Sequence, residues 1–373
     1  MFEIGREELN ALEKLFESRK FFRYQGEVET ECMRFEKSFS SYLGRGASLA
    51  VTSGTNALIL ALEVLGVKAG DEVIIPSYTF IADVTAIKKV GAIPIIAAVD
   101  ESLNLDLDDA RKKITSKTKA LILVYMDGLF PKVEEYQKFC HDHQLLFIED
   151  VAQSLGGEYK GEKLGAFGDA SCFSFNVDKI ISAGEGGLIN FKEEEHYKKA
   201  LMLHDMPVKF GRTYNGYLSD VSYEVGHSMR ISEISGAILN IQLKRLPGIV
   251  SKLRMHRNAL MEAAPHLAWI KASDDAGQAA TQLLLKLESP QKVATVVQEM
   301  LAQNLSALPL YGKPVHCFWQ WLELVYSEKI QRKRFELEMM EQRLFLSSVL
   351  KIPVTYQEAE FERLIKFIKS LGN

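Results

Sequence analysis

A single lysine stands where an apolar run gives way to a cluster of glycines. In the stretch SFNVDKIISAGEGG, Lys179 follows Ser174 by five residues and precedes the glycines of GEGG. The usual role of a lysine is a solvated surface charge. A lysine held at the edge of an apolar sheet can instead have a lowered pKa and react as a nucleophile. The residues around Lys179 therefore decide between the two roles.

A carboxylate and a helix start supply two further groups. Asp150 ends the apolar run LLFIED, and Gln153 follows it. A buried carboxylate is costly unless a cation meets it, although a helix N-cap is an alternative role for such an aspartate. Residues 52–55 (TSGT) precede the helical pattern TNALILAL. Free backbone N–H groups at a helix N-terminus can hold a phosphate, and an ordinary Ser/Thr cap is the alternative.

Two aromatic residues, Tyr78 and Phe80, follow the run DEVIIP. Either ring could stack on a flat cofactor, and each taken alone is more often part of the core. A phosphate cradle, a stacking ring, a buried carboxylate and an amine are together the requirements of a pyridoxal 5'-phosphate site. The chain therefore has the residue types for pyridoxal phosphate chemistry, provided that the fold gathers them at one place.

The pattern of the chain predicts such a fold. Short aliphatic runs without period-2 alternation are typical of strands buried on both faces, which form mainly parallel sheets covered by helices. In open α/β sheets, ligands bind beyond the carboxyl ends of the strands. The expected strands lie within 47–54, 71–77, 92–99, 119–126, 145–150, 172–175 and 186–191, and the expected helices within 55–66, 80–91 and 132–143.

The C-terminal third of the chain has a different sequence pattern. Longer amphipathic helices are predicted at 248–264, 329–345 and 358–370, with one clear strand within 279–287. This pattern predicts a large domain over residues 1–245, including an N-terminal helical segment, and a smaller α+β domain over residues 246–373, joined through a long helix.

Composition narrows the class of protein. The 373 residues carry a formal net charge of -4, so no basic surface for nucleic acid or anionic membrane is indicated, and a small-molecule partner is expected. The four cysteines form no metal-ligand or disulfide spacing, so no metal site is expected and a reducing cytoplasm fits. No apolar run is long enough to span a membrane, and the acidic N-terminus does not resemble an export signal.

Several segments resemble one family in order and spacing. VTSGTNALILAL, GDEVIIPSYTFIA, the stretch from LLFIED to GEGG, and MRISEISGAILNIQLKRL are similar to the DegT/DnrJ/EryC1/StrS family of sugar aminotransferases, which have fold type I and depend on pyridoxal phosphate. The resemblance covers residues 20 to 250 strongly. It implies a mainly parallel seven-stranded sheet between helices, a smaller α+β domain, and a homodimer whose active site is shared between subunits.

The resemblance also implies roles for single residues. Lys179 would hold the cofactor as a Schiff base and then move the substrate proton, and Asp150 would pair with the pyridine nitrogen. Gln153 would lie beside the ring hydroxyl, and Phe80 would stack on the ring. The phosphate would be held by Gly54, Thr55 and Ser174. Ser228 replaces the asparagine with which family members reach the phosphate of the neighbouring subunit.

The reaction implied is amino transfer in two halves through a pyridoxamine 5'-phosphate form. L-Glutamate is the expected donor and a keto or aldehyde sugar the expected acceptor. FFRYQG at 21–26 and LHDM at 203–206 are similar to a subgroup that makes 8-amino-3,8-dideoxy-octulosonate from 8-oxo-KDO, a lipopolysaccharide sugar. A nucleotide-linked 4-keto-6-deoxy sugar is the alternative acceptor. Arg23 and His204 are candidates to face an acidic acceptor, although Arg23 could equally be a surface charge.

Two segments depart from the family pattern, and two other classes of protein stay open. The family loop H-x-Y-G is replaced by YMDGLFP at 125–131, and the aromatic stretch 310–321 is unusual; packing is the favoured role for its His316, Trp319 and Trp321. A cysteine desulfurase or aldolase is one alternative, but Cys172 lies in an apolar run, where a thiol behaves as a small hydrophobe. A non-catalytic binding or regulatory protein of the same fold is the other.

Overall fold

The computed structural model describes residues 4–24, 29–205, 225–354 and 357–371. Within them, a large sheet has the strand order β1-β9-β8-β5-β4-β2-β3. All neighbours are parallel except β9, which runs antiparallel to both β1 and β8. The seven strands are β1 (Ala47–Val51), β2 (Glu72–Pro76), β3 (Ile93–Ala97), β4 (Thr118–Val124), β5 (Leu146–Asp150), β8 (Ala170–Ser174) and β9 (Gly187–Phe191).

Helices cover this sheet, as the aliphatic runs predict. Every residue of β9, and all but the first one or two of β4 and β5, are buried, because helices pack on both faces of the sheet. The helices of this part are α1 (Arg6–Ser18), α2 (Glu31–Leu43), α3 (Gly54–Val64), α4 (Ala82–Lys89), α5 (Leu107–Lys112), α6 (Val133–Asp142) and α7 (Glu194–Leu203). The predicted mainly parallel α/β fold is confirmed.

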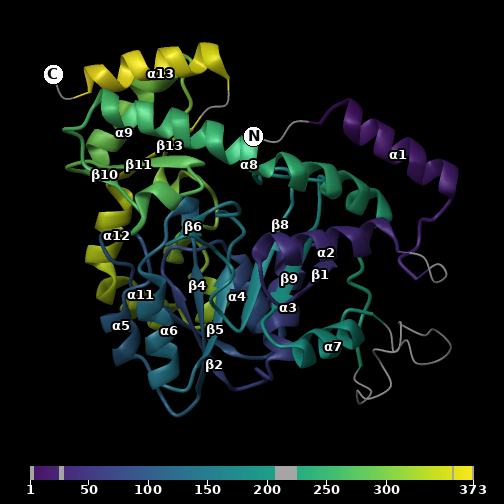
Figure 1. Cartoon of the computed structure of the whole chain (residues 1–373). Coiled ribbons are helices and arrows are strands. Elements are labelled where there is room, and N and C mark those ends of the chain that lie inside the picture. The colour runs from purple at the N-terminus through teal and green to yellow at the C-terminus, as the bar shows by residue number, and fades with distance from the viewer. Residues whose placement is uncertain (1–3, 25–28, 206–224, 355–356, 372–373) are drawn as a thin grey trace.

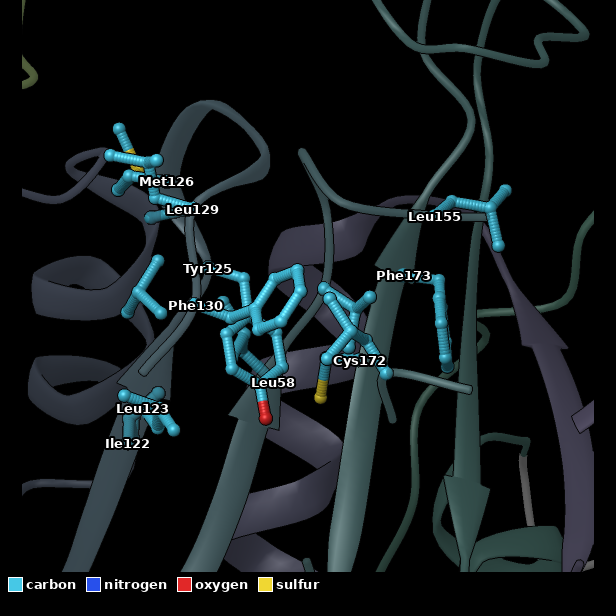
Figure 2. Packing of buried hydrophobic residues seen from close by; sticks show 14 of the residues in the cluster. Leu58, Ile122, Leu123, Tyr125, Met126, Leu129, Phe130, Leu155, Cys172 and Phe173 are labelled. Atoms are coloured by element: carbon cyan, nitrogen blue, oxygen red, sulfur yellow. The ribbon is translucent and has the colours of Figure 1, made fainter. Parts of the chain in front are cut away.

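The core continues past the strand ends into the loops that carry the site. Leu58 of α3, Ile122 and Leu123 of β4, and Cys172 of β8 belong to one buried cluster, together with residues that follow β4 such as Phe130 (Figure 2). Burial raises the pKa of the Cys172 thiol well above its ordinary value, so this cysteine stays an unreactive thiol. The packing therefore argues against Cys172 as a desulfurase nucleophile.

A second sheet forms the C-terminal part, with the order β10-β11-β13-β12 and antiparallel pairing throughout. The sequence indicated one strand here, and the structure has four in the described residues. They are β10 (Trp269–Ile270), β11 (Gln282–Lys286), β12 (Leu308–Pro309) and β13 (Val349–Pro353), and β6 (Glu158–Tyr159) with β7 (Glu162–Lys163) makes a small separate hairpin. The helices are α8 (Glu233–Ala263), α9 (Pro290–Ala302), α10 (Leu322–Val325), α11 (Lys329–Glu338), α12 (Met340–Ser347) and α13 (Glu358–Ser370).

Helix α8 links the two parts. It packs against α1 and α2 at one end and against α13 at the other, and Figure 1 shows it lying along the top of both sheets. The predicted boundary between residues 245 and 246 falls inside this helix, next to Pro247. The long connecting helix is therefore present, and the division into two domains stays a prediction. None of the helices in the described part of the chain is both long and apolar enough to cross a membrane.

Candidate active site

The start of α3 forms a tight cradle at the carboxyl edge of the large sheet. Ser53 caps the helix, and its hydroxyl accepts from the Asn56 N–H at 3.1 Å. An added Cβ at Gly54 would lie 2.9 Å from the Ser174 Cβ, so β8 packs directly on the first turn of α3. Thr55 follows in that first turn, whose N–H groups lack helical partners. The structure thus brings Gly54, Thr55 and Ser174 together, as predicted.

The last glycine of the GEGG motif packs against the same turn. A Cβ at Gly187 would lie 2.3 Å from the carbonyl carbon of Ser53, so only glycine fits there. Gly187 also lies opposite Ser174 in the pairing of β8 with β9. The glycines therefore let β9 begin directly against the cradle, whereas Glu185 between them is exposed.

Lys179 lies in the loop after β8 and is half-buried. It lines a cavity of about 650 Å³. Burial lowers the pKa of the Lys179 amine, the charge of Lys313 lowers it further, and the carboxylate of Asp150 acts in the opposite direction. A lowered pKa leaves a larger neutral fraction, and the neutral amine is the nucleophile.

Asp150 is buried at the end of β5. Its Oδ1 accepts the Ala152 N–H at 2.8 Å, which makes a turn and no helix cap. Burial raises the pKa of the Asp150 carboxyl, while the Ala152 N–H and the Lys179 charge act to lower it. A buried carboxylate at this position was expected to meet a cation, and Lys179 supplies part of that positive charge.

Phe80 and Gln153 line the cavity, and Tyr78 does not. The Phe80 side chain is 39% exposed, with its ring centroid 5.2 Å from that of His316. Tyr78 is buried, and its hydroxyl donates to Asp127 Oδ2 at 2.5 Å. Of these two aromatic residues, Phe80 is therefore the one whose ring a ligand in the cavity can contact.

The sequence missed four residues of the cavity wall, which are Asp127, Lys313, His316 and Lys351. The two unusual segments, 125–131 and 310–321, were the only signals for three of them, and nothing in the sequence pointed to Lys351. His316 was expected to pack in the small domain, and it lines the cavity instead, with its pKa lowered to about 4 chiefly by burial. Trp321 is buried, as expected for packing.

Arg23 and His204 do not line the cavity. Arg23 is buried and makes two hydrogen bonds to the Glu36 carboxylate, at 2.5 and 2.6 Å, so it is not a surface charge, and its role toward the acceptor stays a prediction. His204 is buried, and its ring bonds the Tyr24 hydroxyl and the Leu201 carbonyl. In the two subgroup segments, residues 25–26 and 206 lie outside the described residues.

Ser228 is exposed, next to the described end of the segment that leads into α8. The carbonyl of the adjacent Met229 accepts the Thr52 N–H at 2.9 Å. The backbone next to Ser228 is thus held close to the start of α3.

Comparison with known proteins identifies the family. The sequence profile of the DegT/DnrJ/EryC1/StrS aminotransferase family matches residues 3–357. This chain belongs to that family. GDP-perosamine synthase of Vibrio cholerae is 36% identical over 222 residues, which are 59% of each chain. 3-Amino-5-hydroxybenzoate synthase of Amycolatopsis mediterranei is 34% identical over 244 residues, 64% of this chain and 60% of that one.

The matches to these curated relatives span about three fifths of their length. A solved structure covers more of the chain. The crystal structure of 3-amino-5-hydroxybenzoic acid synthase superposes with a TM-score of 0.85 over 98% of this chain and 96% of its own, at 24% sequence identity. At that identity the likeness establishes the fold, which confirms the fold type expected from the sequence.

Aminotransferases of the DegT/DnrJ/EryC1/StrS family use pyridoxal 5'-phosphate, and the observed residues fit that group. The first turn of α3 has free N–H groups for a phosphate. A protonated pyridine nitrogen would be a cationic partner for the buried Asp150 carboxylate. Phe80 offers a ring face, and Lys179 an amine. When bound, the cofactor supplies an electron sink for the carbon that loses a proton.

The electrostatics of Lys179 predict a pH dependence. The pKa of Lys179 lies below the ordinary 10.5. In the cofactor-free protein, the rate at which an amine-specific reagent modifies Lys179 should therefore rise with pH at lower pH values than for a surface lysine. Asp150→Asn removes a charge that raises the Lys179 pKa, so the profile should move to still lower pH. Peptide mapping of the modified protein against pH checks this, and a shift to higher pH would contradict the assigned contact.

Proposed function

We propose that this protein is a pyridoxal-phosphate-dependent sugar aminotransferase. The observation that carries the proposal is that Lys179, which lines the cavity in the loop after β8, interacts electrostatically with the buried Asp150 at the end of the neighbouring strand β5. Lys179 would hold the cofactor through its amine and then carry the proton of the substrate carbon. Asp150 would keep the ring nitrogen protonated, and Gly54, Thr55 and Ser174 would hold the phosphate.

The reaction exchanges an amine for a carbonyl. An amino acid, for which we propose L-glutamate, loses its amino group and leaves as the 2-oxo acid, and the amino group is then transferred to a sugar carbonyl. The cavity has space for a sugar beside Lys179. We propose 8-oxo-KDO as the acceptor, in the synthesis of a lipopolysaccharide sugar, with a nucleotide-linked 4-keto-6-deoxy sugar as the second candidate, which the similarity to GDP-perosamine synthase favours.

Both acceptors are anions, the first through a carboxylate and the second through a diphosphate. Lys313 lines the cavity half-buried, and it has no salt-bridge partner among residues 4–24, 29–205, 225–354 and 357–371. Asp127 already neutralises Lys351. An acidic acceptor could therefore pair with Lys313, whose charge no described residue neutralises through a salt bridge.

The test is a panel of keto sugars given to the protein in its pyridoxamine phosphate form. Return of the visible absorption of the aldehyde form with 8-oxo-KDO and not with nucleotide sugars supports the first acceptor, and the reverse pattern supports the second. If the purified protein takes up no cofactor at all, the proposed function is wrong and the non-catalytic alternative stands.

Lys313 gives a separate prediction. Lys313→Ala should raise KM for the acidic acceptor about tenfold and change kcat little, because the lost contact is made equally in the ground and transition states. Lys313→Arg, which keeps the charge, should restore most of the affinity. Steady-state kinetics check this, and an unchanged KM would remove Lys313 from acceptor binding.

The predicted homodimer, with Ser228 near the cofactor of the neighbouring subunit, is part of the proposal. The exposure of Ser228 beside the α3 cradle supports it. The cytoplasmic location stays a prediction.

A further inference from the structure

Asp127 stands at a junction between the two sheets. It lies in a short 3-10 turn, η1 (Met126–Gly128), directly after β4. The Asp127 side chain is buried, and its backbone has a φ of +56°, in the left-handed region that few residues other than glycine adopt. Such a conformation persists only where surrounding contacts hold it.

Three contacts hold Asp127, each from a different element. The Tyr78 hydroxyl, beyond the end of β2, donates to Oδ2 at 2.5 Å. The ammonium of Lys351, on β13 of the small sheet, forms an ion pair with Oδ1 across 224 residues of sequence. The backbone N–H of Asp127 donates to Oε1 of Gln153 at 3.1 Å. The turn therefore joins the small sheet to the residue expected beside the cofactor ring.

The ion pair is enclosed. The side chains of Lys351 and Asp127 are 3% and 1% exposed. Charges taken out of water are tolerated when they are paired and hydrogen-bonded, and loss of one partner leaves the other uncompensated. Lys351 is also on the centre of its sheet, between β11 and β12, so its side chain is anchored by a strand paired on both edges.

Backbone contacts beside the pair close the same junction. The Thr79 and Ile81 N–H groups donate to the carbonyls of His316 and Val315, each at 2.9 Å, and the Phe318 N–H donates to the Ser77 carbonyl at 2.9 Å. Segment 315–318 thus lies along residues 77–81, the segment that contains Phe80. The ion pair of Asp127 and Lys351 adds a charged contact to these backbone hydrogen bonds.

We propose that Asp127 and Lys351 are positioning residues: their ion pair fixes the η1 turn, which through the Asp127 N–H holds the Gln153 side chain against the bound cofactor. The inference rests on the proposed function, since it assigns Gln153 to the cofactor ring. Neither Asp127 nor Lys351 is required to touch the reacting atoms. In this arrangement the small domain sets the position of a cofactor contact made by the large domain.

The test compares Asp127→Asn, Lys351→Met and the double variant. Each single variant leaves one buried charge alone and should bind pyridoxal phosphate at least about tenfold more weakly. The double variant has neither charge, so it should regain stability, but its cofactor binding should stay at least about threefold weaker than that of the original protein, because the ion pair that fixes the turn is gone. Lys286→Met is the matched control, because Lys286 lies on β11 of the same sheet and does not line the cavity. It should bind the cofactor normally.

A second cycle separates positioning from plain stability. Gln153→Ala should weaken cofactor binding in the original protein, and it should add little to the loss already present in Lys351→Met, because the two changes remove the same contact. Additive losses would overturn the proposal, as would folded single variants with normal cofactor affinity. If the single variants do not fold, the double variant with and without Gln153→Ala still decides: Gln153→Ala should add little to the loss there, and a full additive loss would overturn the proposal. Failure of the original protein to bind cofactor would instead disprove the proposed function.

Discussion

Lys179→Ala is expected to abolish amino transfer, with kcat reduced by at least about 10⁴. The substitution removes the amine that we propose both to hold the cofactor and to carry the substrate proton. Lys313 and Lys351 also line the cavity, but Lys351 is paired with Asp127, and Lys313 is the residue that we propose for contact with the acceptor. Single-turnover measurements with the amino donor check the loss of the first half of the reaction.

The same variant gives a structural readout. Borohydride reduction should fix the cofactor to the original protein at Lys179 and leave Lys179→Ala unlabelled, while the variant still takes up the cofactor without a covalent bond through the α3 cradle and Phe80. Lys313→Ala is the control, since it keeps the labelled position. Labelling at another lysine in Lys179→Ala, together with full activity, would refute the assignment of Lys179.

Arg23→Met is expected to lower the free energy of unfolding by about 3–5 kcal/mol, because it leaves the Glu36 carboxylate buried without its cation. Arg23 and Glu36 are 3% and 6% exposed in their side chains. Glu36 also accepts the Ala50 N–H of β1 at 2.7 Å, which ties α2 to the edge of the large sheet. Urea unfolding checks the prediction. Arg34→Met is the matched control on α2, since its ion pairs are solvent-exposed, and it should cost less than about 1 kcal/mol.

The destabilisation should depend on pH. Burial raises the pKa of Glu36 and the charge of Arg23 acts to lower it, so Arg23→Met raises that pKa further. A group whose folded pKa exceeds its unfolded value is stabilising when protonated at low pH, and this contribution is lost as the pH rises through the folded pKa. The deficit of Arg23→Met should therefore be smallest in acid and grow toward neutral pH. A deficit independent of pH would mean that lost packing, and not the unpaired charge, is responsible.

Much of the fold could be predicted because its signals are local. The continuous aliphatic runs of β4 and β5 indicate burial on both faces, and the amphipathic pattern over 358–370 coincides with α13. The strand ends carry Asp150 and Ser174, and the rule that ligands bind beyond those ends placed them at one edge. Three strands of the small sheet were missed. Two of them, β10 and β12, have only two residues each, which is too few to show a periodicity.

The sequence by itself determined the chemistry: an amine, a carboxylate and a helix N-terminus, each at the end of a strand in one parallel sheet. Only the tertiary structure decided what surrounds them. The sequence did not show that Arg23 pairs with Glu36 inside the fold, and Lys351 carried no signal until β13 placed it against Asp127. The physical reason is the range of the contacts. Strand burial and helix caps depend on neighbours in sequence, whereas a buried charge is defined by its partner, and here that partner lies 224 residues away.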